Sequence, residues 1–126
     1  MGGVSDSVEN ELLDHILSTA AWTMPSGAYV SLHTADPGET GVNEVVGGSY
    51  GRQGDTAFDV AASGATSNTA DITFTSMPAC TVTHVGIWEV ASAGTFIAGG
   101  IMAPNKPVGA GGTLIIPAGD LDVTLD

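Results

Sequence analysis

The chain has 126 residues, of which two are basic and fourteen are acidic, so its formal net charge is −12. Two cations cannot neutralise a run of phosphates, which argues against binding to a nucleic-acid backbone, and an anionic membrane surface would repel such a chain. Hydrophobic residues make up 43% of the sequence, more than a disordered acidic chain contains, so we expect a folded protein.

The length fits one domain covering residues 1–126, and no linker or internal repeat divides it. The single cysteine, Cys80, cannot form a disulfide within the chain and stands beside no base, so we expect a small buried hydrophobic residue there. No apolar run approaches the roughly 18 residues of a membrane span, and the N-terminus lacks the pattern of a signal peptide. The sequence therefore predicts synthesis inside the cell.

An amphipathic helix is predicted over residues 6–20. Asp6 can cap its start, and Glu9 follows at the spacing of a capping box. The apolar residues of this segment recur at helical spacing and form one stripe: Val8, Leu12, Leu13, Ile16 and Leu17. A Met-Pro-Ser-Gly turn over residues 24–27 ends the segment. Trp22 precedes that turn, and we expect it either at a helix–sheet junction or at a contact between subunits.

Short apolar segments separated by turns fill the rest of the chain. The segment over residues 80–90 is apolar on both faces, which predicts a central strand. Residues 62–67 and the segment between the two prolines at 104 and 107 are predicted to be turns. The full set of predicted strands covers residues 28–33, 56–61, 69–74, 80–90, 95–102, 113–116 and 120–126. About seven short strands after one helix predict a mainly β fold, a β-sandwich or jelly-roll-like domain with one N-terminal helix.

A long glycine-rich loop is predicted over residues 34–55, with a short strand near residues 44–46. Loops of this length are uncommon in compact domains and are often functional. Its acidic part, between Asp36 and Glu44, is the better place for a cation, and the whole loop is long enough to bind a host ligand. The sequence leaves both alternatives open.

Motifs for catalysis or metal binding are weak in this chain. Residues 47–51 match G-x-S-x-G, but no helical pattern follows, so we interpret them as a glycine-rich loop and not as a nucleophile elbow. Asp120 and Asp122 share one face of a strand without the further oxygen ligands of a calcium loop. No two of the three histidines, His15, His33 and His84, have the spacing of metal ligands. We therefore assign no catalytic, cofactor-binding or metal-binding residue and expect no enzyme.

Several motifs occur in a fixed order along the chain. Residues 12–38 read LLDHILSTAAWTMPSGAYVSLHTADPG, followed by GGSYGRQ at 47–53, SNTA at 67–70, THVGI at 83–87 and IPAGDL at 116–121. This series resembles a family of small structural proteins of tailed-phage virions, whose members are labelled head decoration, minor tail or tail fibre proteins. The resemblance implies a structural component of the particle exterior, made in the bacterial cytoplasm, without catalytic residues.

The resemblance and the acidic composition together predict a capsid decoration (cement) protein that binds the major capsid protein on the outer head surface. The alternatives are a tail fibre or minor tail component that binds other tail proteins, and a module that binds a host-surface carbohydrate. We expect a homo-oligomer, because symmetric association is the usual arrangement of such subunits. The predicted partner contacts are Trp22, Arg52 and Lys106. The regions predicted to take part in assembly are an N-terminal arm (residues 2–7), the 34–55 loop and the 104–107 segment.

Overall fold

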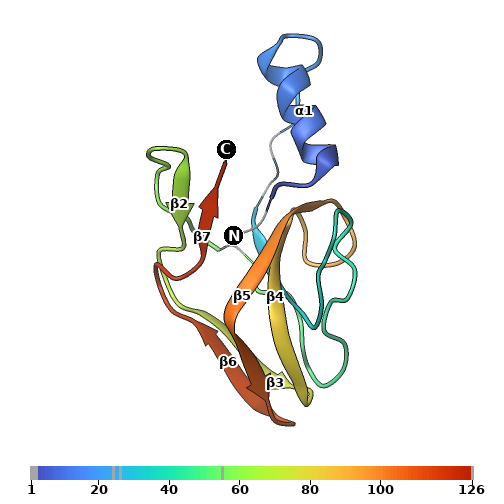
Figure 1. Ribbon diagram of the computed structural model, residues 1–126, viewed down its shortest axis with the longest axis vertical. Coiled ribbons are helices and arrows are strands. Elements are labelled where there is room, and N and C mark those ends of the chain that lie inside the picture. Colours follow the sequence, from blue (N-terminus) through green and yellow to red (C-terminus); the bar gives the residue numbers. More distant parts are fainter. Residues whose placement is uncertain (1–2, 24, 26, 55, 126) are drawn as a thin grey trace.

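The computed structural model describes residues 3–23, 25, 27–54 and 56–125 (Figure 1). Within them, one helix is followed by seven strands. The helix is α1 (Asp6–Ile16), and the strands are β1 (Tyr29–His33), β2 (Ala65–Ser67), β3 (Ile72–Met77), β4 (Cys80–Trp88), β5 (Phe96–Val108), β6 (Gly112–Ile116) and β7 (Asp122–Thr124). The prediction of a mainly β fold with one N-terminal helix is confirmed.

The strands pair in three antiparallel sheets. The largest has the order β1-β4-β5, while β3 pairs with β6 and β2 pairs with β7. β4 therefore lies at the centre of the largest sheet, and its last four residues, which include Ile87 and Trp88, are all buried. The prediction of a central strand over residues 80–90 is confirmed, because a strand covered on both faces needs apolar side chains on both.

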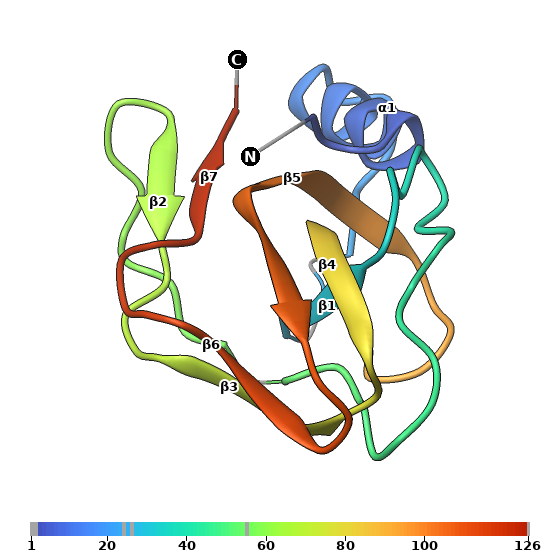
Figure 2. The same cartoon turned by 60° about the horizontal axis from the view of Figure 1, so that its bottom comes forward.

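The hydrophobic core lies between the three-stranded sheet and the β3–β6 pair, which face each other as in a β-sandwich (Figure 2). β1 and β4 supply one side of the core, and β3 and β6 supply the other. The buried residues of this cluster are Val30, Leu32, Val45, Ile72, Phe74, Met77, Val82, Val85, Leu114, Ile116 and Leu121.

After residue 55, three segments differ in type from the sequence prediction. The segment over residues 56–61 is not a strand; it runs beside β2 with scattered hydrogen bonds and one isolated bridge, from Phe58 to Asn68. Within residues 62–67 the turn is confined to the positions around Gly64, and β2 begins directly after it. β5 continues to Val108 through the predicted turn, because its second half is an edge of the sheet, where prolines are tolerated.

Helix α1 is shorter than predicted and packs less than its sequence pattern indicates. It ends at Ile16, after which Ser18 adopts a left-handed conformation (φ 63°) and the Thr19 N–H donates to the Asp14 carbonyl at 2.9 Å. Of the predicted apolar stripe, only Val8 is buried. The described residues contain no helix long and apolar enough to cross a membrane.

The 34–55 loop, described up to residue 54, covers the outer edge of β1. The backbone N–H of Val45 donates to the Leu32 carbonyl at 2.9 Å, and Gln53 exchanges two hydrogen bonds with Val30 at 2.8 and 3.0 Å. In place of the predicted strand near residues 44–46, the structure has one isolated bridge, between Glu44 and His33. Residues 24 and 26 of the predicted turn lie outside the described residues.

Candidate functional site

Arg52 is the centre of a closed polar cluster that fixes the long loop. Its guanidinium forms a salt bridge with Glu44, with Nη2 2.9 Å from Oε1 and Nε 3.0 Å from Oε2. Its Nη1 donates to the carbonyl oxygens of Val90 at 3.0 Å and Ala93 at 2.9 Å. The side chain of Arg52 is only 8% exposed. One cation therefore ties the 34–54 loop to the turn between β4 and β5.

The same guanidinium stacks on the ring of Trp88, with its central carbon 3.7 Å from the ring centroid. Phe96 meets the Trp88 ring edge-on at a centroid distance of 5.1 Å. A planar guanidinium suits this position because it can stack on an aromatic face while its edge donates hydrogen bonds. Arg52 thus combines an ion pair, two carbonyl contacts and an aromatic contact.

Tyr50 extends the cluster into the core. Its hydroxyl donates to Glu44 Oε2 at 2.8 Å and accepts the backbone N–H of Leu32 at 3.0 Å. Burial, above all, raises the pKa of Tyr50 far above its ordinary value, so the phenol stays protonated and continues to donate. Both oxygens of the Glu44 carboxylate are consequently engaged by side chains of its own loop.

His33 belongs to a second buried chain of hydrogen bonds. Its Nδ1 lies 2.8 Å from the Val42 carbonyl, which only accepts, so Nδ1 carries the proton and Nε2 accepts from Ser31 Oγ at 2.7 Å. Ser31 Oγ in turn accepts from Trp88 Nε1 at 3.0 Å. Burial lowers the pKa of His33, which agrees with a neutral imidazole in this arrangement.

The buried hydrogen-bond donors and acceptors of these two networks find their partners within the chain. Among the described residues, no buried side-chain nitrogen or oxygen lacks a hydrogen-bond partner. His33 and Ser31 are fully buried, so their short contact presents no nucleophile to a substrate. The arrangement holds the loop rigidly against the sheet.

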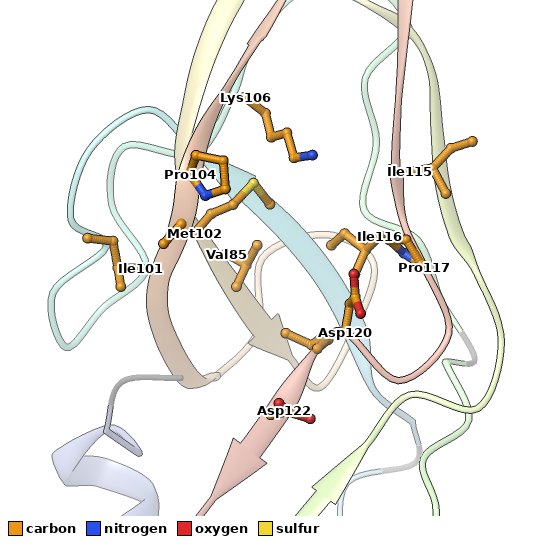
Figure 3. A pocket seen from close by; sticks show the side chains of 12 residues that line it. Val85, Ile101, Met102, Pro104, Lys106, Ile115, Ile116, Pro117, Asp120 and Asp122 are labelled. Atoms are coloured by element: carbon orange, nitrogen blue, oxygen red, sulfur yellow. The ribbon is translucent and has the colours of Figure 1, made fainter.

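An open groove of about 370 Å³ lies between β5 and the segment from β6 to β7 (Figure 3). Its walls are mainly apolar, and Lys106 stands at one end while Asp120 and Asp122 lie toward the other. The apolar side chains that line it are those of Val85, Ile101, Met102, Ala103, Pro104, Ile115, Ile116, Pro117 and Leu121. An apolar groove with a few charged groups at its ends is a surface that can bind part of another protein.

The structure places the three predicted contact residues in separate regions. Trp22 is half-buried after α1, where its backbone N–H donates to His15 Nδ1 at 3.2 Å. Arg52 lies over Trp88 at one end of β4, whereas Lys106 is exposed and pairs in register with Val82 near the other end, roughly 20 Å away along the strand. Arg52 is engaged within its own subunit, which leaves Lys106 as the more accessible of the two cations.

The other candidate ligands of the sequence also stay apart. Asp36 Oδ1 accepts the N–H of Gly38 at 2.8 Å, as in a local turn, and the Glu44 carboxylate is paired with Arg52. No group of three or more potential metal ligands occurs in the described part of the chain. Residues 47–51 form a loop without a following helix, as expected.

Sequence reasoning missed the Glu44–Tyr50–Arg52 cluster and the groove. The signal for the cluster was the presence of one of only two cations in an acidic, glycine-rich loop that also contains a tyrosine. Such a cation has a carboxylate of its own loop as its nearest available counter-ion. The groove had no local signal, because its walls form only when the four consecutive strands β4 to β7 and the connection between β6 and β7 come together in space.

Comparison with known proteins identifies the family. The model of a family described as "Podophage GP4 fiber I protein gp80" matches residues 3–124. A search among curated proteins finds no match. The family match confirms the resemblance to structural proteins of phage virions, and it extends over almost the whole chain. This chain belongs to the Podophage GP4 fiber I protein gp80 family.

Proposed function

We propose that this chain is a subunit of a phage tail fibre and works by contact with other virion proteins, without catalysis. The observation that carries the proposal is the family match over residues 3–124, whose description names a fibre protein. It favours a tail fibre over the head decoration protein predicted from the sequence.

The architecture supports a structural role. Buried ion-pair and hydrogen-bond contacts around Arg52 and His33 fix the described part of the 34–55 loop to the sheet, so the loop and the sheet form one packed unit. Rigid subunits suit a fibre, because a contact made at one end is transmitted to the other only if the body between them does not yield.

The groove between β5 and β6 supports a contact surface for a neighbouring virion protein. Its apolar walls favour burial, and Lys106 at its end is an exposed cation on an otherwise acidic chain. Lys106 is exposed and lines this groove, which supports it as the cation of such a contact.

The test is to locate the chain on purified virions. Heads and tails are separated after mild disruption, and the chain is quantified in each fraction by mass spectrometry with labelled peptide standards. Immunogold labelling of intact particles gives the position independently. We expect the chain in the tail fraction at a low copy number per particle. Hundreds of copies in the head fraction would refute the proposal and support a decoration protein.

A further inference from the structure

The groove lies along the open side of the β-sandwich, between the edges of its two sheets. β5 ends the β1-β4-β5 sheet, and β6 pairs with β3 alone among the described strands. Both strands line the groove, β5 between Ile101 and Lys106 and β6 through Ile115 and Ile116 (Figure 3). An unpaired strand edge presents backbone N–H and C=O groups that another extended chain can bind. The partner that such a groove binds therefore depends on which of the two edges is free.

The edge of β5 is poorly suited to pairing with a further strand. Part of its first half is already covered, because a bridge joins Ala98 to Val4 of the N-terminal segment. Its second half contains Pro104 and Pro107, which have no backbone N–H to donate. Prolines at such positions protect a strand edge against pairing with another chain. A partner strand therefore gains little from hydrogen bonds to β5.

The edge of β6, by contrast, is open. No proline lies within Gly112–Ile116. In the part of the chain that the structure describes, residues 113–116 make backbone hydrogen bonds with no element other than β3. Successive residues of a strand direct their N–H and C=O groups to opposite sides, so about half of these groups point away from β3. β6 can therefore accept one more strand along the groove.

The side chains along this edge determine which residues an added strand needs. Leu114 and Ile116 are buried whereas Ile115 is 48% exposed, so inward and outward side chains alternate along β6. Across the groove, the wall formed by β5 is apolar, and its Ile101 is 69% exposed. A strand paired with β6 follows the same alternation, so every second side chain of it enters the groove. Those side chains must be apolar to match the walls.

Charges of opposite sign mark the two ends of the groove. Lys106 stands at one end, and Asp120 and Asp122 lie toward the other (Figure 3). All three residues are exposed, and the one salt bridge within the described residues involves none of them. The chain as a whole carries a net charge of −12, so a cation beside the two aspartates is favoured by the local and by the overall charge. A matching segment is therefore basic at one end.

We propose that the groove binds an extended segment of another virion protein, which adds a strand to the free edge of β6. Apolar side chains at alternate positions of that segment fill the groove. A lysine or arginine at one end meets Asp120 and Asp122, and an acidic residue at the other end meets Lys106. The five residues of β6 span about 17 Å, so a short segment covers the whole edge.

This contact rests on the proposed function, because it specifies the partner surface through which a fibre subunit works. A second copy of the chain is a poor occupant. Of its two cations, Arg52 is held in the salt bridge to Glu44, and Lys106 lies in the groove itself. The basic residue that Asp120 and Asp122 attract must therefore come from a different protein.

Cross-linking in purified virions identifies the segment. Phage particles carry Ile115→Cys in a Cys80→Ala background, the thiol is coupled to a short photoreactive maleimide, and the linked peptides are sequenced by mass spectrometry after illumination. Val60→Cys is the matched control, because Val60 is 96% exposed and lies outside the groove. Ile101→Cys, on the opposite wall, replaces Ile115→Cys if that variant is not incorporated. We expect cross-links to one segment with alternating apolar residues and a basic end, well above the yield from position 60.

A synthetic peptide of the linked segment then tests strand pairing on the full chain by fluorescence anisotropy. We expect a dissociation constant on the order of 1–100 µM. Because only every second amide of an added strand faces β6, N-methylation of one alternate set of amides should weaken binding at least about tenfold, while methylation of the other set is tolerated. Asp120→Asn with Asp122→Asn should weaken it roughly three- to thirtyfold. Glu9→Gln with Glu11→Gln removes the same charge from α1 and should have little effect.

The outcomes separate this contact from the proposed function. The strand contact is overturned by cross-linking no greater than from position 60 in particles that contain the chain, by cross-links to a second copy, or by a peptide that tolerates both methylation patterns. If the chain is nevertheless in the tail fraction, the proposed function stands without this contact. A linked segment from a head protein, with the expected methylation pattern, would instead refute the tail-fibre role and keep the strand contact.

Discussion

Replacement of Arg52 by methionine tests whether the buried cluster stabilises the subunit. The substitution keeps an apolar side chain over Trp88 but removes the salt bridge to Glu44 and both carbonyl contacts. Loss of one partner of a buried ion pair typically costs 3–5 kcal/mol, because the other charge is left desolvated. Glu44 is 21% exposed and regains some hydration, so we expect a loss of about 3 kcal/mol in the free energy of unfolding.

The assay is urea unfolding followed by tryptophan fluorescence, and Lys106→Met is the matched control. Both substitutions remove one positive charge from a chain of net charge −12, so the change in overall repulsion is the same. Lys106 is exposed, and its replacement should change stability by no more than about 0.5 kcal/mol. Combining Arg52→Met with Glu44→Gln should recover about 1–3 kcal/mol relative to additivity. Equal losses for Arg52→Met and Lys106→Met would refute the role assigned to the cluster.

Three further predictions concern the parts around this cluster. Burial lowers the pKa of His33 in the folded state, so as the pH falls the unfolded chain takes up the proton first. The free energy of unfolding should therefore fall as the pH drops below about 6.5. In urea titrations at several pH values, His33→Gln should remove this part of the pH dependence. Tyr50→Phe should cost about 1–3 kcal/mol by the same assay, because it leaves a buried backbone N–H of β1 without its acceptor. Gly41→Ala should cost about 1–3 kcal/mol more than Gly38→Ala; both glycines have positive φ, but only at position 41 would the added methyl overlap the Trp88 ring. Equal thermal midpoints for these two alanine variants would contradict the described packing.

Local sequence patterns were sufficient to predict the central strand and the presence of the helix. The central strand was predictable because burial of both its faces requires apolar residues throughout, and residues 80–90 have them. The helix was predictable from its spacing, but its packing was not. The stripe from Val8 to Leu17 indicates an amphipathic helix equally well whether its apolar face meets its own sheet or another molecule.

Long-range pairing decided the elements that the sequence misassigned. β2 has three residues, too few to display an alternating pattern, and it is a strand only because β7 pairs with it 55 residues later. β5 can run through Pro104 and Pro107 because it is an edge strand of its sheet, where a residue without a backbone N–H is tolerated. A lone cation in an acidic loop signals an ion pair for Arg52, but the carboxylate that engages it is decided by the way the loop folds back on β1.

The role of Arg52 changes what the charge of this chain means for its partners. One of its two cations is paired with Glu44 and nearly buried. The described residues include twelve acidic ones, and twelve minus Glu44 leaves eleven, none of them buried, against the exposed Lys106. A partner that binds this surface through charge must supply the cations itself, whereas a second copy offers the same acids. Copies of the chain therefore repel each other over most of this surface, and a stable contact between them needs apolar burial to offset that repulsion. On this reasoning, salt should strengthen contacts between copies and weaken contacts to a basic virion partner, so the sign of the salt dependence distinguishes the two.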